Sequence, residues 1–122
     1  MLRFPIPKQN LVRRFMEHFG QQVPEKKGLP PVATAVTRAE MIIEEANELQ
    51  FSANTVEYLD AVCDLLYVVY GAAVEAGFNA DTIDQAFLEV HRSNMSKLWT
   101  LAEILDHPMM RTDGVKVTAM DP

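Results

Sequence analysis

Apolar residues recur every three or four positions through most of the chain, a spacing typical of helices with one buried face. The first such pattern lies within residues 5–20 and predicts a helix that ends at Gly20. Residues 21–31 contain three prolines and Gly28, so they predict a loop.

A second apolar pattern predicts a helix that begins near Thr34 or Thr37 and ends at about Ser52. Thr37 followed by Glu40 matches a capping box, in which a hydroxyl and a carboxylate accept hydrogen bonds from the free amides of the first turn. This signal favours a helix start close to Thr37.

Two more helices follow in the chain. Asn54, with Glu57 three residues later, predicts the start of a third helix that runs to Gly77. Asp81 predicts the cap of a fourth helix lasting to about Lys97. No segment has the alternating pattern of a strand, so the fold class expected is all-α, a four-helix bundle.

Length and charge narrow the function. The 122 residues are expected to form one domain, residues 1–122. A net charge of −6 disfavours a nucleic-acid polymer as partner, but a divalent cation can still bridge acids and a small phosphorylated ligand. The single Cys63, the lack of a leader and the lack of a long apolar run predict a soluble cytoplasmic protein without a membrane partner.

The third helix is apolar on almost every side, which predicts burial by its own bundle and by a second subunit, hence a homodimer or homotetramer. The exception is one narrow strip at helical spacing. It consists of Glu57, Asp60, Asp64, Tyr67 and Gly71.

Acidic residues also border the core face of the second helix. Glu45 and Glu48 flank its apolar stripe, whereas Glu44 lies further toward solvent. The short connection at residues 53–54 predicts that the two helices pack antiparallel. Four acids then converge, and a divalent ion with hard oxygen ligands, Mg²⁺ or Mn²⁺, would relieve their repulsion. They are Glu45, Glu48, Asp60 and Asp64.

The alternative is that these acids form a solvated helix face, the usual position of charged side chains. That interpretation accounts for Glu40, Glu44 and Glu57. It accounts less well for Asp60 and Asp64, which interrupt the most apolar helix of the chain.

The fourth helix carries candidates for phosphate binding. Asn94 lies on an apolar stripe, where its amide needs partners that a ligand supplies, and Lys97 follows one turn later. Arg92 is either a phosphate contact or an ordinary surface charge. His91 is more typical of a core histidine than of a catalytic one.

Residues 44–48 (EEANE) followed by residues 60–66 (DAVCDLL) resemble the all-α nucleoside triphosphate pyrophosphohydrolase superfamily, which includes MazG-type enzymes, dimeric dUTPases and phosphoribosyl-ATP pyrophosphohydrolase. Residues 64–71 and 90–97 resemble the phosphoribosyl-ATP pyrophosphohydrolase-like branch more narrowly. The resemblance covers roughly residues 15–97. It implies metal-dependent hydrolysis of a nucleoside triphosphate, dUTP included, to a monophosphate and pyrophosphate.

The resemblance also implies roles for individual residues. Glu45, Glu48 and Asp64 would bind the metal, and Glu44 would be a fourth ligand or would orient the attacking water. Either Glu44 or Glu45 would act as the catalytic carboxylate. Separately from the resemblance, the residues of the fourth helix make the candidate substrate-binding set His91, Arg92, Asn94 and Lys97.

One position departs from the superfamily pattern, which has ExxD on the helix after EExxE. With Asp64 as the final acid, Ala61 occupies the glutamate position. Asp60 can face the same ion from i, i+4 spacing, or Glu57 and Asp60 form the pair instead. Two alternative functions stay open: phosphoribosyl-ATP hydrolysis, and a non-catalytic binding or dimerisation module, which the Ala61 departure favours.

Overall fold

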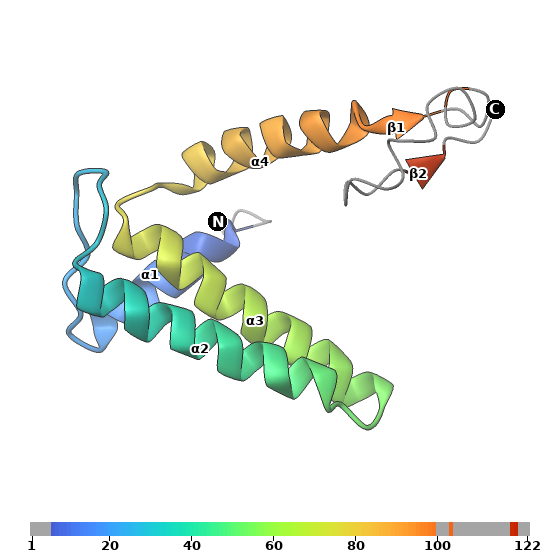
Figure 1. Ribbon diagram of the computed structural model, residues 1–122. Helices are drawn as coiled ribbons and strands as arrows, with labels where there is room; N and C mark the ends of the chain where they lie inside the picture. Colours follow the sequence, from blue (N-terminus) through green and yellow to red (C-terminus); the bar gives the residue numbers. More distant parts are fainter. Residues whose placement is uncertain (1–5, 100–102, 104–117, 120–122) are drawn as a thin grey trace. The chain divides into compact units, whose positions relative to one another are not determined.

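The computed structural model describes residues 6–99, 103 and 118–119. The helices are α1 (Lys8–His18), α2 (Val32–Gln50), α3 (Thr55–Glu75) and α4 (Ala80–Met95). Two-residue strands, β1 (Leu98–Trp99) and β2 (Thr118–Ala119), pair in parallel (Figure 1). The prediction of an all-α bundle with four helices is confirmed.

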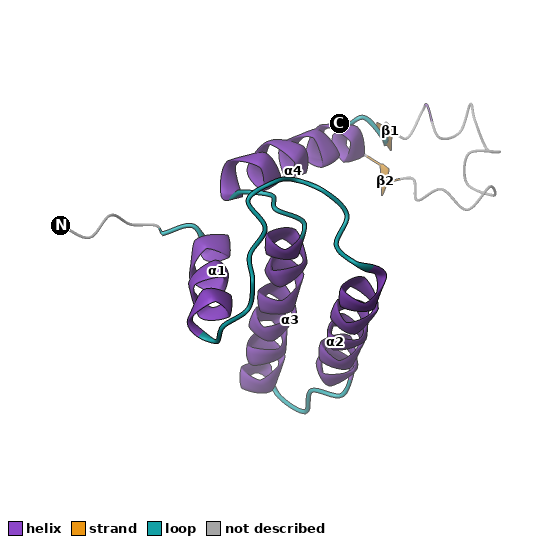
Figure 2. Ribbon diagram, turned by 90° about the vertical axis from the view of Figure 1, so that its left-hand side faces the viewer, coloured by secondary structure: helices purple, strands orange, loops and turns teal. Residues whose placement is uncertain are grey.

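The chain divides into two compact units, Met1–Ile83 and Asp84–Pro122. In the first unit, α2 and α3 pack side by side as an antiparallel pair, and α1 packs on α3 (Figure 2). The prediction of a single domain is not tested by this division and stays a prediction.

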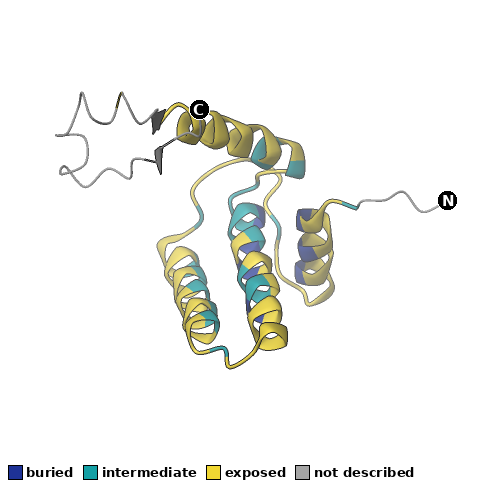
Figure 3. Ribbon diagram, turned by 90° about the vertical axis from the view of Figure 1, so that its right-hand side faces the viewer, coloured by how far each residue is buried: buried dark blue, intermediate teal, exposed yellow. Residues whose placement is uncertain are grey.

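The core of the first unit lies between α1 and α3. Val12 and Met16 of α1 and Val74 of α3 form it, and the partly buried Val23 and Tyr70 pack against them. In Figure 3 the buried positions are concentrated on α1 and α3. By contrast, no residue of α2 is fully buried, and its Ile42 and Leu49 are half-buried.

The start of α3 follows the sequence prediction. The Asn54 side chain accepts a hydrogen bond from the Glu57 amide at 2.9 Å, and the Glu57 carboxylate accepts one from the Ala53 amide at 2.7 Å. These contacts satisfy amides that the first helical turn leaves free. The prediction that Asn54 opens this helix is confirmed.

Two other helix starts differ from the prediction. Helix α2 begins at Val32, directly after Pro31, so Thr37 lies inside the helix and the capping box with Glu40 is wrong. Proline is unfavourable inside a helix but is tolerated at its start. The helix therefore begins directly after Pro30 and Pro31. Helix α4 begins at Ala80, so the prediction of Asp81 as its cap is also wrong.

The actual signal at α4 is Asn79. Its side-chain oxygen accepts a hydrogen bond from the Thr82 amide at 2.8 Å, the usual role of an N-cap residue. Asp81 lies in the first turn of α4, where its negative charge complements the helix dipole.

The loop between α1 and α2 is attached to the end of α3. The Gly28 amide donates to the Ala76 carbonyl at 3.0 Å. Gly77 has φ 76°, and a Cβ atom there would lie 2.3 Å from the Lys26 carbonyl oxygen. Gly77 is therefore required both by its backbone conformation and by the close approach of the loop.

Several apolar side chains of α3 are exposed in the single chain. Leu59 is 63% exposed, and Leu66 and Val69 are 43% and 44% exposed. The bundle of one chain therefore does not bury this helix on all sides, and its burial by a second subunit stays a prediction.

Within the described residues, none of the helices taken singly is long and apolar enough to span a membrane, although α3 and α4 together meet the length and composition requirement as a bent pair.

Candidate metal site

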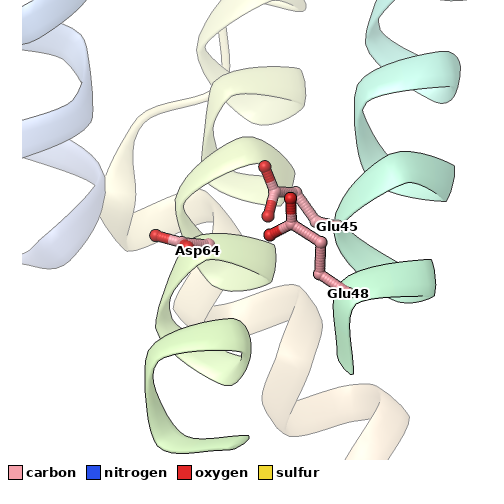
Figure 4. Close-up of side chains that lie close together, drawn as sticks. All are labelled: Glu45, Glu48 and Asp64. Atoms are coloured by element: carbon pink, nitrogen blue, oxygen red, sulfur yellow. The ribbon is translucent and has the colours of Figure 1, made fainter. Parts of the chain in front are cut away.

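Three carboxylates come together between α2 and α3. Glu45, Glu48 and Asp64 each offer an oxygen, and these oxygens lie within 4.8 Å of one another (Figure 4). Glu45 and Glu48 are three residues apart, so they project from the same side of α2. The antiparallel packing then brings Asp64 of α3 opposite them.

The environment of Glu45 disfavours its charged form. Burial raises the pKa of Glu45, and the negative charges of Glu48, Asp64 and Glu44 raise it further. Its Oε2 atom is buried and has no hydrogen-bond partner among the described residues. A buried carboxylate oxygen without a partner is costly, and a bound cation would remove that cost.

The donor set fits a hard divalent cation. All three ligands are carboxylate oxygens, the type that Mg²⁺ and Mn²⁺ prefer. The three residues come from two different helices, so the metal would also hold α2 and α3 together. The spacing and the unpartnered Oε2 atom together make this a candidate metal site.

The other predicted acids lie differently. Glu44 is exposed on α2 next to Glu45. Asp60 is exposed and is not part of the carboxylate group. Glu57 accepts the Ala53 amide at the start of α3, and Ala61, at the position of the superfamily glutamate, is buried.

The candidate phosphate-binding residues lie in the second unit. Arg92 forms an ion pair with Glu89 one turn earlier on α4. The Lys97 ammonium lies 3.5 Å from the Asn94 side-chain oxygen. His91 is exposed. Lys97 and Asn94 therefore form a pair at the end of α4, whereas the charge of Arg92 is neutralised locally.

Sequence reasoning missed one charged pair in the same helix interface. Arg38 of α2 donates to both carboxylate oxygens of Glu75 of α3, at 2.8 and 3.0 Å. Arg38 lies seven residues before Glu45, on the same side of α2, and Glu75 lies eleven residues after Asp64, but nothing within either helix joins the two residues.

Comparison with known proteins agrees with this geometry. The family model of phosphoribosyl-ATP pyrophosphohydrolase matches residues 12–94, which include α2, α3 and the three clustered acids. No curated protein matches the chain.

The family match places the chain in the class of pyrophosphohydrolases of the MazG-like all-α superfamily. The chain belongs to the phosphoribosyl-ATP pyrophosphohydrolase family. The resemblance noted in the sequence is thereby confirmed.

Proposed function

We propose that the chain is a metal-dependent hydrolase that converts a nucleoside triphosphate to its monophosphate and pyrophosphate. The observation that supports it most directly is the group formed by Glu45, Glu48 and Asp64, with a buried and unpartnered Glu45 oxygen. These three residues would hold Mg²⁺ or Mn²⁺, and a cation bound there would supply positive charge to the phosphate oxygens of the substrate.

The chain's own carboxylates handle the attacking water. Glu44, exposed beside the site, or Glu45 orients the water and accepts its proton. The water oxygen bonds to the α-phosphorus, the bond from the α-phosphorus to the bridging oxygen breaks, and pyrophosphate leaves with that electron pair.

The Asn94–Lys97 pair at the end of α4 has the chemistry for contacts to substrate. Lys97 carries a positive charge suited to the departing pyrophosphate, and Asn94 offers an amide to the sugar, the base or the α-phosphate. Arg92 and His91 are secondary candidates, since Arg92 already pairs with Glu89.

A second candidate substrate is phosphoribosyl-ATP. The family match favours it, because the matching model carries that activity in its name. Its triphosphate end has the same α–β phosphoanhydride bond as a free nucleoside triphosphate, so the same three acids serve either substrate. The two substrates differ in the group attached to the base, which requires a larger pocket.

We also propose that two or more copies associate through the apolar face of α3. The exposed Leu59, Leu66 and Val69 support this arrangement, since apolar groups of this size are seldom left in water on neighbouring turns. Sedimentation of the purified chain tests it. A monomer at all concentrations contradicts it.

The experiment that tests the reaction is pyrophosphate release from a panel of nucleoside triphosphates, dUTP included, and from phosphoribosyl-ATP. Each is incubated with Mg²⁺, with Mn²⁺ and with a chelator. Release that requires metal and leaves a monophosphate supports the proposal and ranks the substrates. No release from any of them favours a non-catalytic binding module instead.

A further inference from the structure

Helices α2 and α3 share an ion pair that is mostly withdrawn from solvent. The side chains of Arg38 and Glu75 are 11% and 16% exposed. The guanidinium donates to both carboxylate oxygens, and Nη1 also lies 3.4 Å from the Val68 carbonyl. By contrast, the Arg13–Glu17 pair lies within one helix with side chains 46% and 51% exposed.

Gly71 provides the space for this pair. A Cβ atom on Gly71 would lie 2.4 Å from Arg38 Nη1 and 2.7 Å from Cζ. Both distances are shorter than any ordinary contact, so the guanidinium occupies the volume that a side chain would fill. The backbone of α3 therefore approaches the planar guanidinium directly, and this fixes the rotation of both helices about their axes.

The pair also fixes how far the helices are shifted along each other. Arg38 to Glu48 is ten residues and Glu75 to Asp64 is eleven, which correspond to about 15 Å and about 17 Å along a helix. Because the helices run antiparallel, the register that joins Arg38 to Glu75 also brings Glu48 level with Asp64. A shift by one turn, about 5 Å, would separate the carboxylates.

Apolar burial of α2 is limited. Helix α2 has no fully buried residue, and its Ile42 and Leu49 are half-buried. The clustered carboxylates repel one another and so oppose the close packing of the two helices. The Arg38–Glu75 pair acts against that repulsion two to three turns away.

We propose that Arg38 is a positioning residue for the metal site: its pairing with Glu75 over Gly71 holds α2 and α3 in the register that places Glu45, Glu48 and Asp64 around one cation. Its charge is neutralised by Glu75, so it is not the phosphate-binding cation. The inference rests on the proposed metal-dependent function and adds a residue outside the carboxylate group.

The test measures Mn²⁺ binding to the full chain by electron paramagnetic resonance, without substrate. The main variant is the double substitution Arg38→Met with Glu75→Met, which removes both charges and leaves neither partner buried alone. Replacing a buried ion pair by apolar side chains generally preserves the fold. We expect the dissociation constant for Mn²⁺ to rise by about 10- to 100-fold, as for other residues that position ligands.

Two further variants separate positioning from general stability. Arg38→Lys keeps the charge but loses the two parallel hydrogen bonds, so we expect an intermediate Mn²⁺ affinity and partial rescue relative to the double variant. Arg13→Met removes the exposed arginine of α1 and is expected to bind Mn²⁺ as the wild type does.

The outcomes are distinct. A wild-type chain that binds no Mn²⁺ overturns the proposed function and this inference with it. A wild-type chain that binds Mn²⁺, together with a folded double variant of equal affinity, overturns the positioning role alone. Weaker binding in the double variant, with unchanged circular dichroism and the expected partial rescue by lysine, supports it.

Discussion

The α2–α3 interface contains charged residues at two positions along the helix axes, and the two groups differ in net charge. At one position, Arg38 and Glu75 form a bidentate ion pair. At the other, Glu45, Glu48 and Asp64 lie within 4.8 Å, and none of them has an ion-pair partner among the residues that the structure describes. The same two helices thus carry one neutral group and one group with excess negative charge.

This difference separates a structural from a functional arrangement of similar residues. A buried carboxylate with a matched cation has its charge and hydrogen bonds satisfied within the chain. A buried carboxylate oxygen without a partner, such as Glu45 Oε2, is incomplete until a ligand supplies positive charge. Buried acidic residues alone therefore do not indicate a metal site; the absence of a matched cation is the informative observation.

The largest effect is expected from changing the carboxylate group that has no matched cation. Glu48→Gln or Asp64→Asn should lower metal-dependent turnover by more than about 100-fold. Mutation of residues that only orient metal ligands already lowers activity by up to about that factor. Pyrophosphate release under saturating Mg²⁺ measures it. Glu40→Gln, an exposed acid on α2, is the matched control and should retain activity.

The same assay decides the role of Asp60, which the sequence analysis placed among the ligands. Asp60 is exposed and outside the clustered group, so Asp60→Asn should lower turnover much less than Asp64→Asn. Equal losses in the two variants would contradict the set of ligands inferred from the geometry.

The next largest effect is expected from breaking the Arg38–Glu75 ion pair. Arg38→Met leaves the carboxylate of Glu75 largely buried without its cation and should lower the free energy of unfolding by about 3 kcal/mol. Urea denaturation measures the change. Arg13→Met, in an exposed pair, should change it by less than about 0.5 kcal/mol. Similar values for the two variants would remove the distinction drawn for Arg38.

A smaller effect is expected from filling the space beside the guanidinium. Gly71→Ala should lower the free energy of unfolding by about 1 kcal/mol, because the added methyl group displaces the end of the Arg38 side chain while alanine's higher helix propensity offsets part of that cost. Gly28→Ala is the matched control, since a Cβ atom there meets nothing within 4 Å. Thermal denaturation of both variants checks the prediction, and equal melting temperatures would show that Arg38 moves aside freely.

The smallest effect is a pH dependence of the metal-free protein. The pKa of Glu45 is raised in the folded chain, so between its unfolded value of about 4.3 and the folded value the folded state binds more protons. This contribution to stability is complete below the unfolded pKa and is lost as pH rises through the folded one. Urea denaturation with chelator should show a decline that Glu45→Gln reduces; an identical profile in that variant would contradict it.

The helices were predictable because their apolar spacing and several end signals are local. Asn54 was recognised as a cap since its partner, Glu57, lies three residues away. The false capping box at Thr37 shows the limit of local patterns, because the prolines before Val32 allow the helix to start a turn and a half earlier. The cap at Asn79 was missed because Asp81, nearby, offered an equally good side chain.

The site was partly predictable for the same reason. The spacing of Glu45 and Glu48 fixed their common side of α2, and the short connection indicated the antiparallel pairing that brings in Asp64. The exposure of Asp60 depends on the rotation of α3, and the Arg38–Glu75 contact joins residues 37 apart in sequence. Neither follows from a pattern within one helix, so both required the packed structure.

Cys63 is exposed on α3 immediately before Asp64. It is the single cysteine of the chain. A thiol-reactive fluorophore or nitroxide therefore attaches at one defined position, and no other cysteine has to be replaced first. A label at Cys63, which shares a face of α3 with Leu59 and Leu66, reports spectroscopically whether a second copy covers that face.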